Sequence, residues 1–244
     1  GAPMDSGFMT RMAGLLARLK SDSSFPRNDC LPEVSPESSD RPLADAQLTY
    51  ENFYYVLADW LVGEGHCQRS KLILGESSSL YVFGNLFGLP RDGFIAQAAW
   101  GSLGHETGCA LGIELGSGQR PIIVAGDGGF MMICQELSSL VRQKSNAIIF
   151  VMSNGGYAIE QAFVDIKAFS EAGQYAPFDL LPSWDYQALA KAFGAKGYGV
   201  NTVGQLQDLL LVELAVPTGQ PALVEVTLSL QDLPPQLRRL AEPG

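Results

Sequence analysis

Two side chains with oxygen donors, Asp127 and Asn154, each follow directly on an apolar run rich in β-branched residues. The runs 121–126 and 146–153 have the composition of buried parallel strands. The segment between them, 131–141, repeats its apolar residues at helical spacing, so the three segments together predict a βαβ unit. Its crossover returns the chain in the same direction, which places both polar side chains at the carboxyl edge of the sheet. Open α/β sheets bind their ligands at that edge.

These residue types suit a divalent cation. Neighbouring strands lie about 4.8 Å apart and Mg²⁺ binds oxygen at about 2.1 Å, so two adjacent strand ends can hold one ion. Asp127 offers a carboxylate oxygen, Asn154 an amide oxygen, and the turn Gly155-Gly156 a backbone carbonyl. A helix that opens near Gly129 would direct free N–H groups at the same place, where an anion fits. Because Mg²⁺ commonly shares its shell with phosphates, the pattern predicts a metal-bridged diphosphate site.

The same residues resemble a known signature. GDG, an Asn 27 residues after the Asp, and then GGY are similar to the thiamine diphosphate (ThDP) motif. The segment Asn154-Gly155-Gly156-Tyr157-Ala158-Ile159-Glu160 resembles, more narrowly, the N-x-G-Y-x-[IV]-E segment of pyruvate and indolepyruvate decarboxylases. The resemblance implies a ThDP- and Mg²⁺-dependent enzyme. It also implies an α/β fold with a three-layer, doubly wound, mostly parallel sheet and helices on both faces.

The resemblance also implies roles for individual residues. The metal ligands would be Asp127, the side chain of Asn154 and the carbonyl of Gly156. Glu160 would be the active-site acid above the thiazolium ring. Leu103 would wedge under the cofactor, and the carbonyl of Gly101 would accept a hydrogen bond from its 4′-amino group. The full set expected to contact the cofactor is Ser79, Gly101, Leu103, Gly128, Gly129, Asn154, Tyr157 and Ile159.

Several of these positions have a second interpretation. The usual Asn-Asn pair of the family is Ser153-Asn154 here, and Gly129 stands where Ser or Ala is frequent, which leaves only its backbone for phosphate contact. The turn 75–79 that contains Ser79 is equally typical of a solvated turn with a helix cap. Without the resemblance, the turn 100–104 would indicate only that Ser102 or Gly104 caps a helix.

The pair His105-Glu106 matches the start of the zinc-protease motif H-E-x-x-H, but the second histidine of that motif is absent. Such a pair in a first helical turn is typical of the polar surface of a helix. His66, in a glycine-flanked loop, is expected to be exposed rather than catalytic. Neither histidine is therefore assigned a role.

The composition of the chain limits the classes of molecule that it is expected to bind. The 244-residue chain is 46% hydrophobic and has a formal net charge of −10, which argues against nucleic acid or an anionic membrane as a partner. Four scattered cysteines without a C-x-x-C motif fit free thiols in a reducing cytoplasm. No apolar run approaches the about 20 residues of a membrane helix, and no signal peptide is visible.

The sequence divides the chain into five parts from the N-terminus to the C-terminus. Its parts are a cleavage scar at 1–3, an amphipathic helix at 4–20, a Ser/Pro-rich linker at 21–46, a diphosphate-binding domain at 47–235 and a polar tail at 236–244. Within the domain, Thr49 is expected to cap the first helix, with Asn52 at its third position. Further helices are expected at 157–170, 185–194 and 204–215, and further strands at 71–74, 94–97, 196–200 and 221–228.

The function expected from the resemblance is decarboxylation of a small-molecule 2-oxo acid to an aldehyde. It requires a pyrimidine-binding domain with a carboxylate for the cofactor's N1′ atom, from a second chain of a split, oligomeric enzyme or from a segment of a longer protein. One alternative is a ThDP-dependent carboligase of the acyloin or acetolactate type. Another is a non-catalytic regulatory module that keeps the fold, although intact Asp127, Asn154 and Glu160 argue against it.

Overall fold

The computed structural model describes residues 41–63, 65–76, 78–81, 89–90, 92–170, 172–234 and 236–238. The expected scar, the helix at 4–20 and most of the linker lie outside the described residues, as does the end of the tail from residue 239 on.

The described part of the chain is built on a six-stranded sheet in the order β2-β1-β3-β4-β6-β5, in which all neighbouring strands are parallel. β3 and β4, the strands predicted to bear the site, are neighbours near the centre, with Gly126 opposite Met152. Asp127 and Asn154 therefore leave adjacent strand ends, as the βαβ pattern predicts. The strands are β1 (Ser70–Leu74), β2 (Phe94–Ala96), β3 (Arg120–Gly126), β4 (Ile148–Ser153), β5 (Lys196–Val200) and β6 (Ala222–Thr227).

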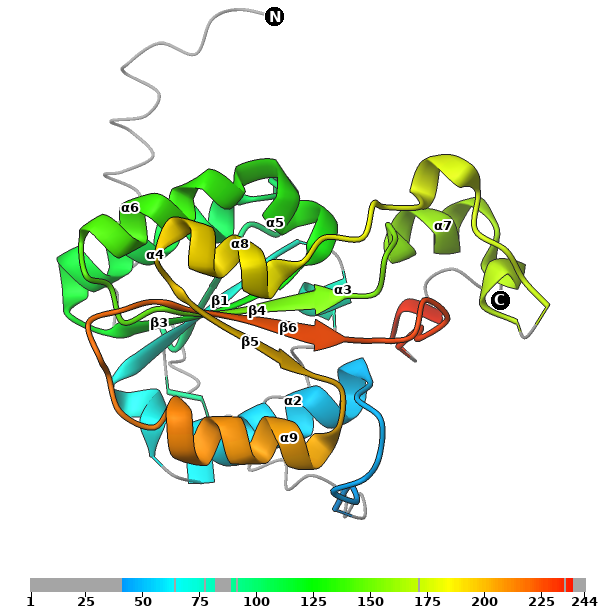
Figure 1. Cartoon of the computed structure of the whole chain (residues 1–244). Coiled ribbons are helices and arrows are strands. Elements are labelled where there is room, and N and C mark those ends of the chain that lie inside the picture. The colour runs from blue at the N-terminus through cyan, green and yellow to red at the C-terminus, as the bar shows by residue number, and fades with distance from the viewer. Residues whose placement is uncertain are drawn as a thin grey trace, which may run out of the picture. The chain divides into compact units, whose positions relative to one another are not determined.

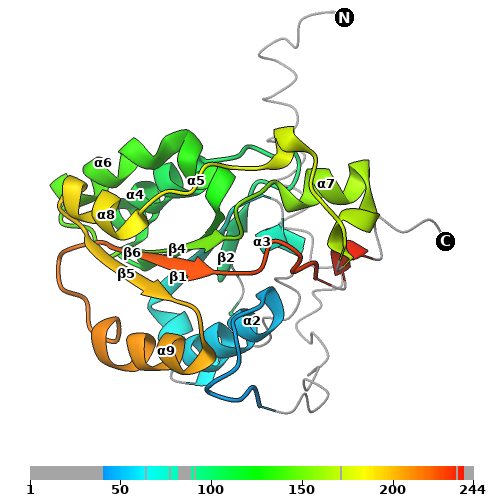
Figure 2. The same cartoon turned by 45° about the vertical axis from the view of Figure 1, so that its right-hand side comes forward.

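Helices cover both faces of this sheet, which confirms the three-layer α/β architecture (Figures 1 and 2). One face is covered by α2 (Tyr50–Ala58) and α9 (Val203–Asp208), and the other by α4 (His105–Ser117), α5 (Asp127–Ile133), α6 (Leu137–Arg142) and α8 (Tyr186–Phe193). The short helices α3 (Ser78–Tyr81) and α7 (Ala158–Val164) lie near and beyond the carboxyl ends of the strands (Figure 1). None of the described helices combines the length and the apolar character that crossing a bilayer requires.

The alternation of side chains along each strand divides the interior into two clusters. Ile122 and Val124 of β3 pack toward α2 and α9, whereas Ile123 and Ala125 pack toward α4, α5, α6 and α8. Since both faces are covered, every residue from 121 to 125 is buried, and this explains why the strand is apolar throughout rather than alternating.

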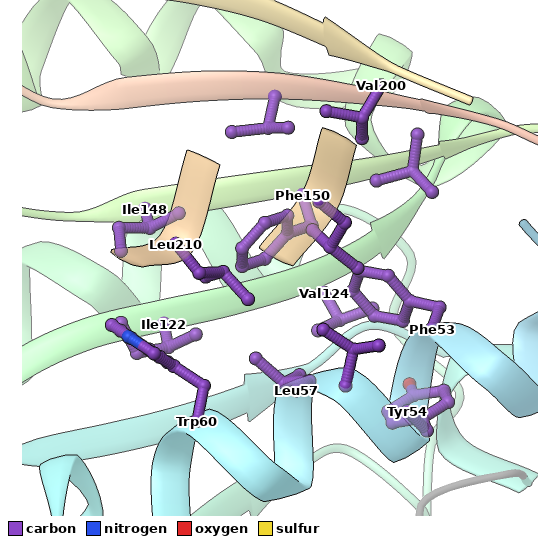
Figure 3. Close-up of a cluster of buried hydrophobic side chains, with 14 of the residues drawn as sticks. Phe53, Tyr54, Leu57, Trp60, Ile122, Val124, Ile148, Phe150, Val200 and Leu210 are labelled. Carbon is purple, nitrogen blue, oxygen red and sulfur yellow. The ribbon is translucent and has the colours of Figure 1, made fainter. Parts of the chain in front are cut away.

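Phe53 of α2 lies at the centre of the first cluster (Figure 3), where its ring meets that of Phe150 edge to face, with 5.4 Å between centroids. We expect Phe53→Ala to lower the free energy of unfolding by about 3–5 kcal/mol, because it leaves a cavity in a fully buried layer. Urea unfolding followed by circular dichroism measures this change. The exposed Leu43 provides the control, since Leu43→Ala should change stability by at most about 0.5 kcal/mol. A loss below about 1 kcal/mol for Phe53→Ala would contradict the assigned core.

Helix ends follow the predicted caps in some places and not in others. Thr49 and Asn52 form the expected capping box of α2. The helix predicted from about residue 129 begins earlier, at Asp127, whose carboxylate accepts the backbone N–H of Gly128 at 2.9 Å. The helix predicted over 157–170 is interrupted: α7 ends at Val164, and the extended residue Asp165 caps a separate 3₁₀ turn at Ile166–Phe169 by accepting the N–H of Lys167.

Both ends of the described domain pack differently from expectation. The carbonyls of Ala44 and Ala46, which fall in the predicted linker, accept the N–H groups of Gly204 and Val203 at the start of α9. Leu237, placed by the sequence in a polar tail, is buried against a small cluster that includes Phe169 of the 3₁₀ turn. The described domain therefore includes residues on both sides of the boundaries that composition indicated.

Candidate active site

A cleft of about 360 Å³, counted to its open mouth, lies at the carboxyl ends of β3 and β4. It is the place that the βαβ pattern predicted, because both strands end there and their turns form the floor. The residues that line it are Tyr50, Glu76, Ser78, Leu103, Gly126, Asp127, Gly128, Gly129, Asn154, Gly156, Tyr157, Ala158 and Glu160.

The carboxylate of Asp127 ties the two turns of the floor together. Its Oδ1 atom accepts the N–H of Gly128 at 2.9 Å, and its Oδ2 atom accepts the N–H of Gly155 at 2.7 Å. Asn154 turns its Oδ1 atom toward the N–H of Gly156, at 3.3 Å. Both side chains are buried, so bulk water has little access to their oxygens, and the backbone N–H groups hold these oxygens in fixed positions.

The environment of Asp127 fits a cation. Burial raises the pKa of its carboxyl group to about 6, although backbone N–H donors of Gly155 and Gly128 act in the opposite direction. In the described part of the chain no group of three His, Cys, Asp or Glu side chains is arranged to hold a metal by itself. One carboxylate, one amide oxygen and backbone carbonyls instead suit a hard ion that completes its shell with water and ligand oxygens, as Mg²⁺ does.

Gly128 is in direct contact with an aromatic ring. A Cβ atom at this position would lie 2.3 Å from Cε1 of Tyr157, so the ring rests on the glycine's Cα. Both residues line the cleft. The second glycine of GDG therefore allows Tyr157 to pack against the turn that follows β3.

We expect Gly128→Ala to weaken ThDP binding by at least about tenfold, because the added methyl displaces either Tyr157 or the turn that bears Asp127. Isothermal titration with ThDP and Mg²⁺ measures this change. Gly112 on α4, whose Cβ position is open, provides the control: Gly112→Ala should bind as the wild type does. Equal affinity for Gly128→Ala would show that the cofactor does not use this turn.

The turn before α4 brings Leu103, but not Gly101, to the cleft. Leu103 is among the lining residues, and its Cδ2 atom would lie 3.9 Å from a Cβ atom at Gly129. Gly104 caps the helix with φ +85°, and a side chain there would meet Ile133 at 2.7 Å, so this position requires glycine. Gly101 is exposed and does not line the cleft of this chain.

Of the remaining predicted residues, Glu160 lines the cleft, whereas Ile159 and Ser79 do not. Glu160 lies in the first turn of α7, at the exposed rim of the cleft. Ile159 packs instead against the cluster that contains Phe169 and Leu237. Ser79 is buried beneath α2, and its carbonyl accepts the hydroxyl of Tyr54 at 2.6 Å, while its neighbour Ser78 lines the cleft.

Tyr50 and Glu76 also line the cleft, although neither was assigned a role from the sequence. Burial raises the pKa of the Tyr50 phenol well above its usual value, so it is a neutral hydrogen-bonding group at neutral pH. The position of Thr49 as a cap indicated where α2 begins, but not that this first turn reaches the ends of β3 and β4. Ser153, the departure from the usual Asn, donates to Glu225 of β6 at 3.1 Å.

The interpretation of His105-Glu106 as polar surface is wrong. Glu106 is 1% exposed and His105 is mostly buried, because the first turn of α4 packs against the glycines that follow β1 and β3. His66, expected to be exposed, is half-buried and stacks on Trp60 with 4.3 Å between ring centroids. The thiols of Cys67, Cys109 and Cys134 are free; Cys67 is buried, whereas Cys109 and Cys134 are half-buried.

The chain is similar to known enzymes over most of its length. It is 29% identical over 250 residues to a pyruvate decarboxylase of Aspergillus fumigatus, an alignment that covers 97% of this chain and 40% of that protein. It is 30% identical to pyruvate decarboxylase isozyme 3 of Saccharomyces cerevisiae, with 75% of this chain and 33% of that protein covered. The chain thus spans less than half the length of these relatives.

Solved structures show the same similarity. Benzoylformate decarboxylase from Polynucleobacter necessarius superposes with a TM-score of 0.64 at 26% identity, covering 81% of this chain and 35% of that one. An enzyme from Mycobacterium smegmatis described as a putative thiamin diphosphate-dependent enzyme superposes with a TM-score of 0.62 at 22% identity and shares the fold. The family model described as "Thiamine pyrophosphate enzyme, C-terminal TPP binding domain" matches residues 80–226, which include every metal ligand predicted above. The chain belongs to this family of C-terminal thiamine pyrophosphate-binding domains.

Proposed function

We propose that the chain is the diphosphate-binding part of a ThDP- and Mg²⁺-dependent enzyme that decarboxylates a small 2-oxo acid. The observation that supports this most strongly is that one cleft gathers Asp127, Asn154 and Glu160. The names of the relatives, pyruvate decarboxylase and benzoylformate decarboxylase, both describe the decarboxylation of a 2-oxo acid.

The floor of the cleft would hold the cofactor. Mg²⁺ would take the carboxylate of Asp127, the amide oxygen of Asn154 and the carbonyl of Gly156, together with diphosphate oxygens. The backbone of Gly128 and Gly129 would line the diphosphate, and Tyr157 would close it from the side of α7. When bound, ThDP supplies the carbon nucleophile for the carbonyl group of the substrate, and the protein supplies binding and orientation.

Glu160 would handle protons. It lies at the exposed rim of the cleft, whereas the other carboxylate of the signature, Asp127, is buried in the floor and bonded to two backbone N–H groups. The two carboxyl groups therefore have different tasks: Asp127 binds the ion, and Glu160 gives or takes a proton at the reacting end of the cofactor.

The cleft is open on one side, and we propose that a pyrimidine-binding domain covers it and brings the carboxylate for N1′. Large apolar side chains are exposed on the segments that also carry lining residues, the turn before α4, helix α5 and helix α7: Trp100 (85%), Met132 (54%) and Phe163 (62%). Apolar surface of this kind marks interaction sites. The covering domain would belong to a second chain of an oligomer or to another segment of a longer protein; the free thiols suit a reducing cytoplasm.

The test is to combine the chain with ThDP, Mg²⁺, a 2-oxo acid and a pyrimidine-binding domain from the same source, and to identify the products. Release of CO₂ with a free aldehyde supports decarboxylation, and an acyloin or acetolactate product indicates carboligation on the same site. ThDP binding without turnover of any 2-oxo acid would indicate a regulatory module. We expect the chain alone to bind ThDP weakly and not to turn over, and robust CO₂ release by the chain alone would refute the need for a covering domain.

A further inference from the structure

A buried carboxyl group, that of Glu106, lies behind the floor of the cleft. Glu106 is the second residue of α4 and is 1% exposed. Within the described part of the chain, neither of its carboxyl oxygens has a hydrogen-bond partner of good geometry. The nearest basic atom is Nδ1 of His105, 3.3 Å from Oε2, and this nitrogen also lies 2.8 Å from the carbonyl oxygen of Ser102. A charge in this place is thus poorly compensated.

The carboxyl group reaches between the two glycine turns that meet at the cofactor site. A Cβ atom added at Gly75, directly after β1, or at Gly129, in the first turn of α5, would lie 3.3 Å from Oε1 of Glu106. Gly129 lines the cleft, whereas Glu106 does not. Gly129 therefore borders both the buried carboxyl group and the cleft proposed for the diphosphate.

The surroundings favour the uncharged form. Burial raises the pKa of Glu106 and outweighs the backbone N–H groups of Glu106 and Gly104 and the side chain of His105, which lower it. The carboxylate of Glu76, on the turn after β1, adds a smaller upward shift. On α4 itself Cys109 is the other titratable neighbour, and burial, with a smaller effect from the charge of Glu106, raises the pKa of its thiol. From α5, Gly129 approaches the carboxyl group with its uncharged backbone, and the charged residue of this helix is Asp127, two positions earlier.

We propose that Glu106 is a positioning residue that closes the back of the diphosphate site as a neutral carboxylic acid, and that the bound cofactor selects this protonated form. This inference rests on the proposed function, because it requires the diphosphate in the cleft. The physical reason is electrostatic: Mg²⁺ offsets part of the diphosphate charge, and the phosphate oxygens that would lie against Gly129 still repel a carboxylate behind it through a low-dielectric wall. Removing the carboxylate charge by protonation removes that repulsion.

The sign of the pH dependence follows. A bound anion raises the pKa of Glu106 above its value in the free protein, so binding takes up a proton between the two values. Affinity has its full value below the free-protein pKa, falls as pH rises through the interval, and then levels off. Each unit by which the cofactor raises this pKa corresponds to about a tenfold weaker affinity on the alkaline side.

The experiment is a titration of the full chain, with its pyrimidine-binding domain where that is needed for measurable binding, against ThDP and Mg²⁺ from about pH 5.5 to pH 8.5. Glu106→Gln keeps the shape of the side chain but cannot ionise. Glu51→Gln is the matched control, because Glu51 is the second residue of α2 and is exposed. Titration of the cofactor and of Asp127 is common to all three proteins and cancels in the ratio of their dissociation constants.

We expect the dissociation constant of the wild type, divided by that of Glu106→Gln, to rise about tenfold or more with pH, and the ratio to Glu51→Gln to stay constant. A flat ratio for Glu106→Gln, with ThDP still bound, would overturn this inference and leave the proposed function intact. Absence of ThDP binding by all three proteins at every pH would overturn both.

A second measurement needs only the wild type and covers the case that Glu106→Gln does not fold. Infrared difference spectra with and without ThDP and Mg²⁺ report the C=O stretch of protonated carboxyl groups. We expect this band to grow on binding at about pH 8, where Asp127, with a pKa of about 6, is already ionised, in the wild type and in Glu51→Gln alike. A band that does not change on binding would contradict the proposal.

Discussion

Asp127→Ala is expected to abolish Mg²⁺-dependent binding of ThDP, with an affinity loss of more than about 100-fold, because the variant removes the only carboxylate that we assign to the ion. The same change leaves the N–H groups of Gly128 and Gly155 without their acceptor, so both turns of the floor lose their connection. Isothermal titration with ThDP in the presence of Mg²⁺, and again in the presence of a chelator, measures the metal-dependent part of the affinity.

Two further variants separate charge from fold. Asp127→Asn keeps a hydrogen-bond acceptor at the same place but removes the charge, so it should fold as the wild type does and still lose most of the metal dependence. Asp208, exposed on α9, supplies a control on the opposite face of the sheet, where Asp208→Ala should bind normally. If Asp127→Ala retained the full effect of Mg²⁺, the ion would have to be held elsewhere.

Glu160→Gln is expected to lower kcat by roughly 10²–10⁴-fold, the usual contribution of a positioned acid–base group, while ThDP affinity stays unchanged. The reason is its position: Glu160 stands on α7 at the rim, whereas the ligands proposed for Mg²⁺ are in the floor. Steady-state kinetics with the pyrimidine-binding domain present give kcat, and titration of the same protein with ThDP gives the affinity.

Glu51→Gln, which alters an exposed carboxylate in the first turn of α2, is the control for general charge effects and should leave kcat unchanged. An unaltered kcat for Glu160→Gln would remove this residue from the reaction. A parallel loss of ThDP affinity would instead place the carboxylate in the binding site for the cofactor.

The centre of the fold was predictable because its signals are local. The strands β3 and β4 are buried on both faces and therefore apolar at nearly every position, and each is followed by a polar residue that starts a glycine turn. The cap Thr49 marked the beginning of α2, because its side chain accepts the N–H of Asn52, three residues further on. The helix expected from Asp185 begins one residue later, because Asp185 caps it by accepting the N–H of Ala188. Adjacency of the two strand ends followed from the crossover rule alone.

The features of the fold and the site that the sequence did not predict depend on contacts between segments far apart in the sequence. Nothing local distinguishes Glu106 from an exposed first-turn glutamate such as Glu51, because its burial comes from glycines at positions 75 and 129. The sequence does not show which of the two serines, Ser78 or Ser79, lines the cleft. A hydrogen bond from the hydroxyl of Tyr54 to the carbonyl of Ser79 accounts for the position of Ser79 under α2. Leu237 lies in a polar stretch, and only the cluster around α7 explains why it is buried.

The most direct test of the account is a crystal structure of the chain grown with ThDP and Mn²⁺, in which anomalous scattering locates the ion. We predict a single peak in the cleft, at roughly the 2.1 Å expected for Mg²⁺ from a carboxylate oxygen of Asp127 and from Oδ1 of Asn154, with the diphosphate against Gly128 and Gly129. A peak at another place, or a cofactor bound outside this cleft, would contradict the assignment on which every role proposed here depends.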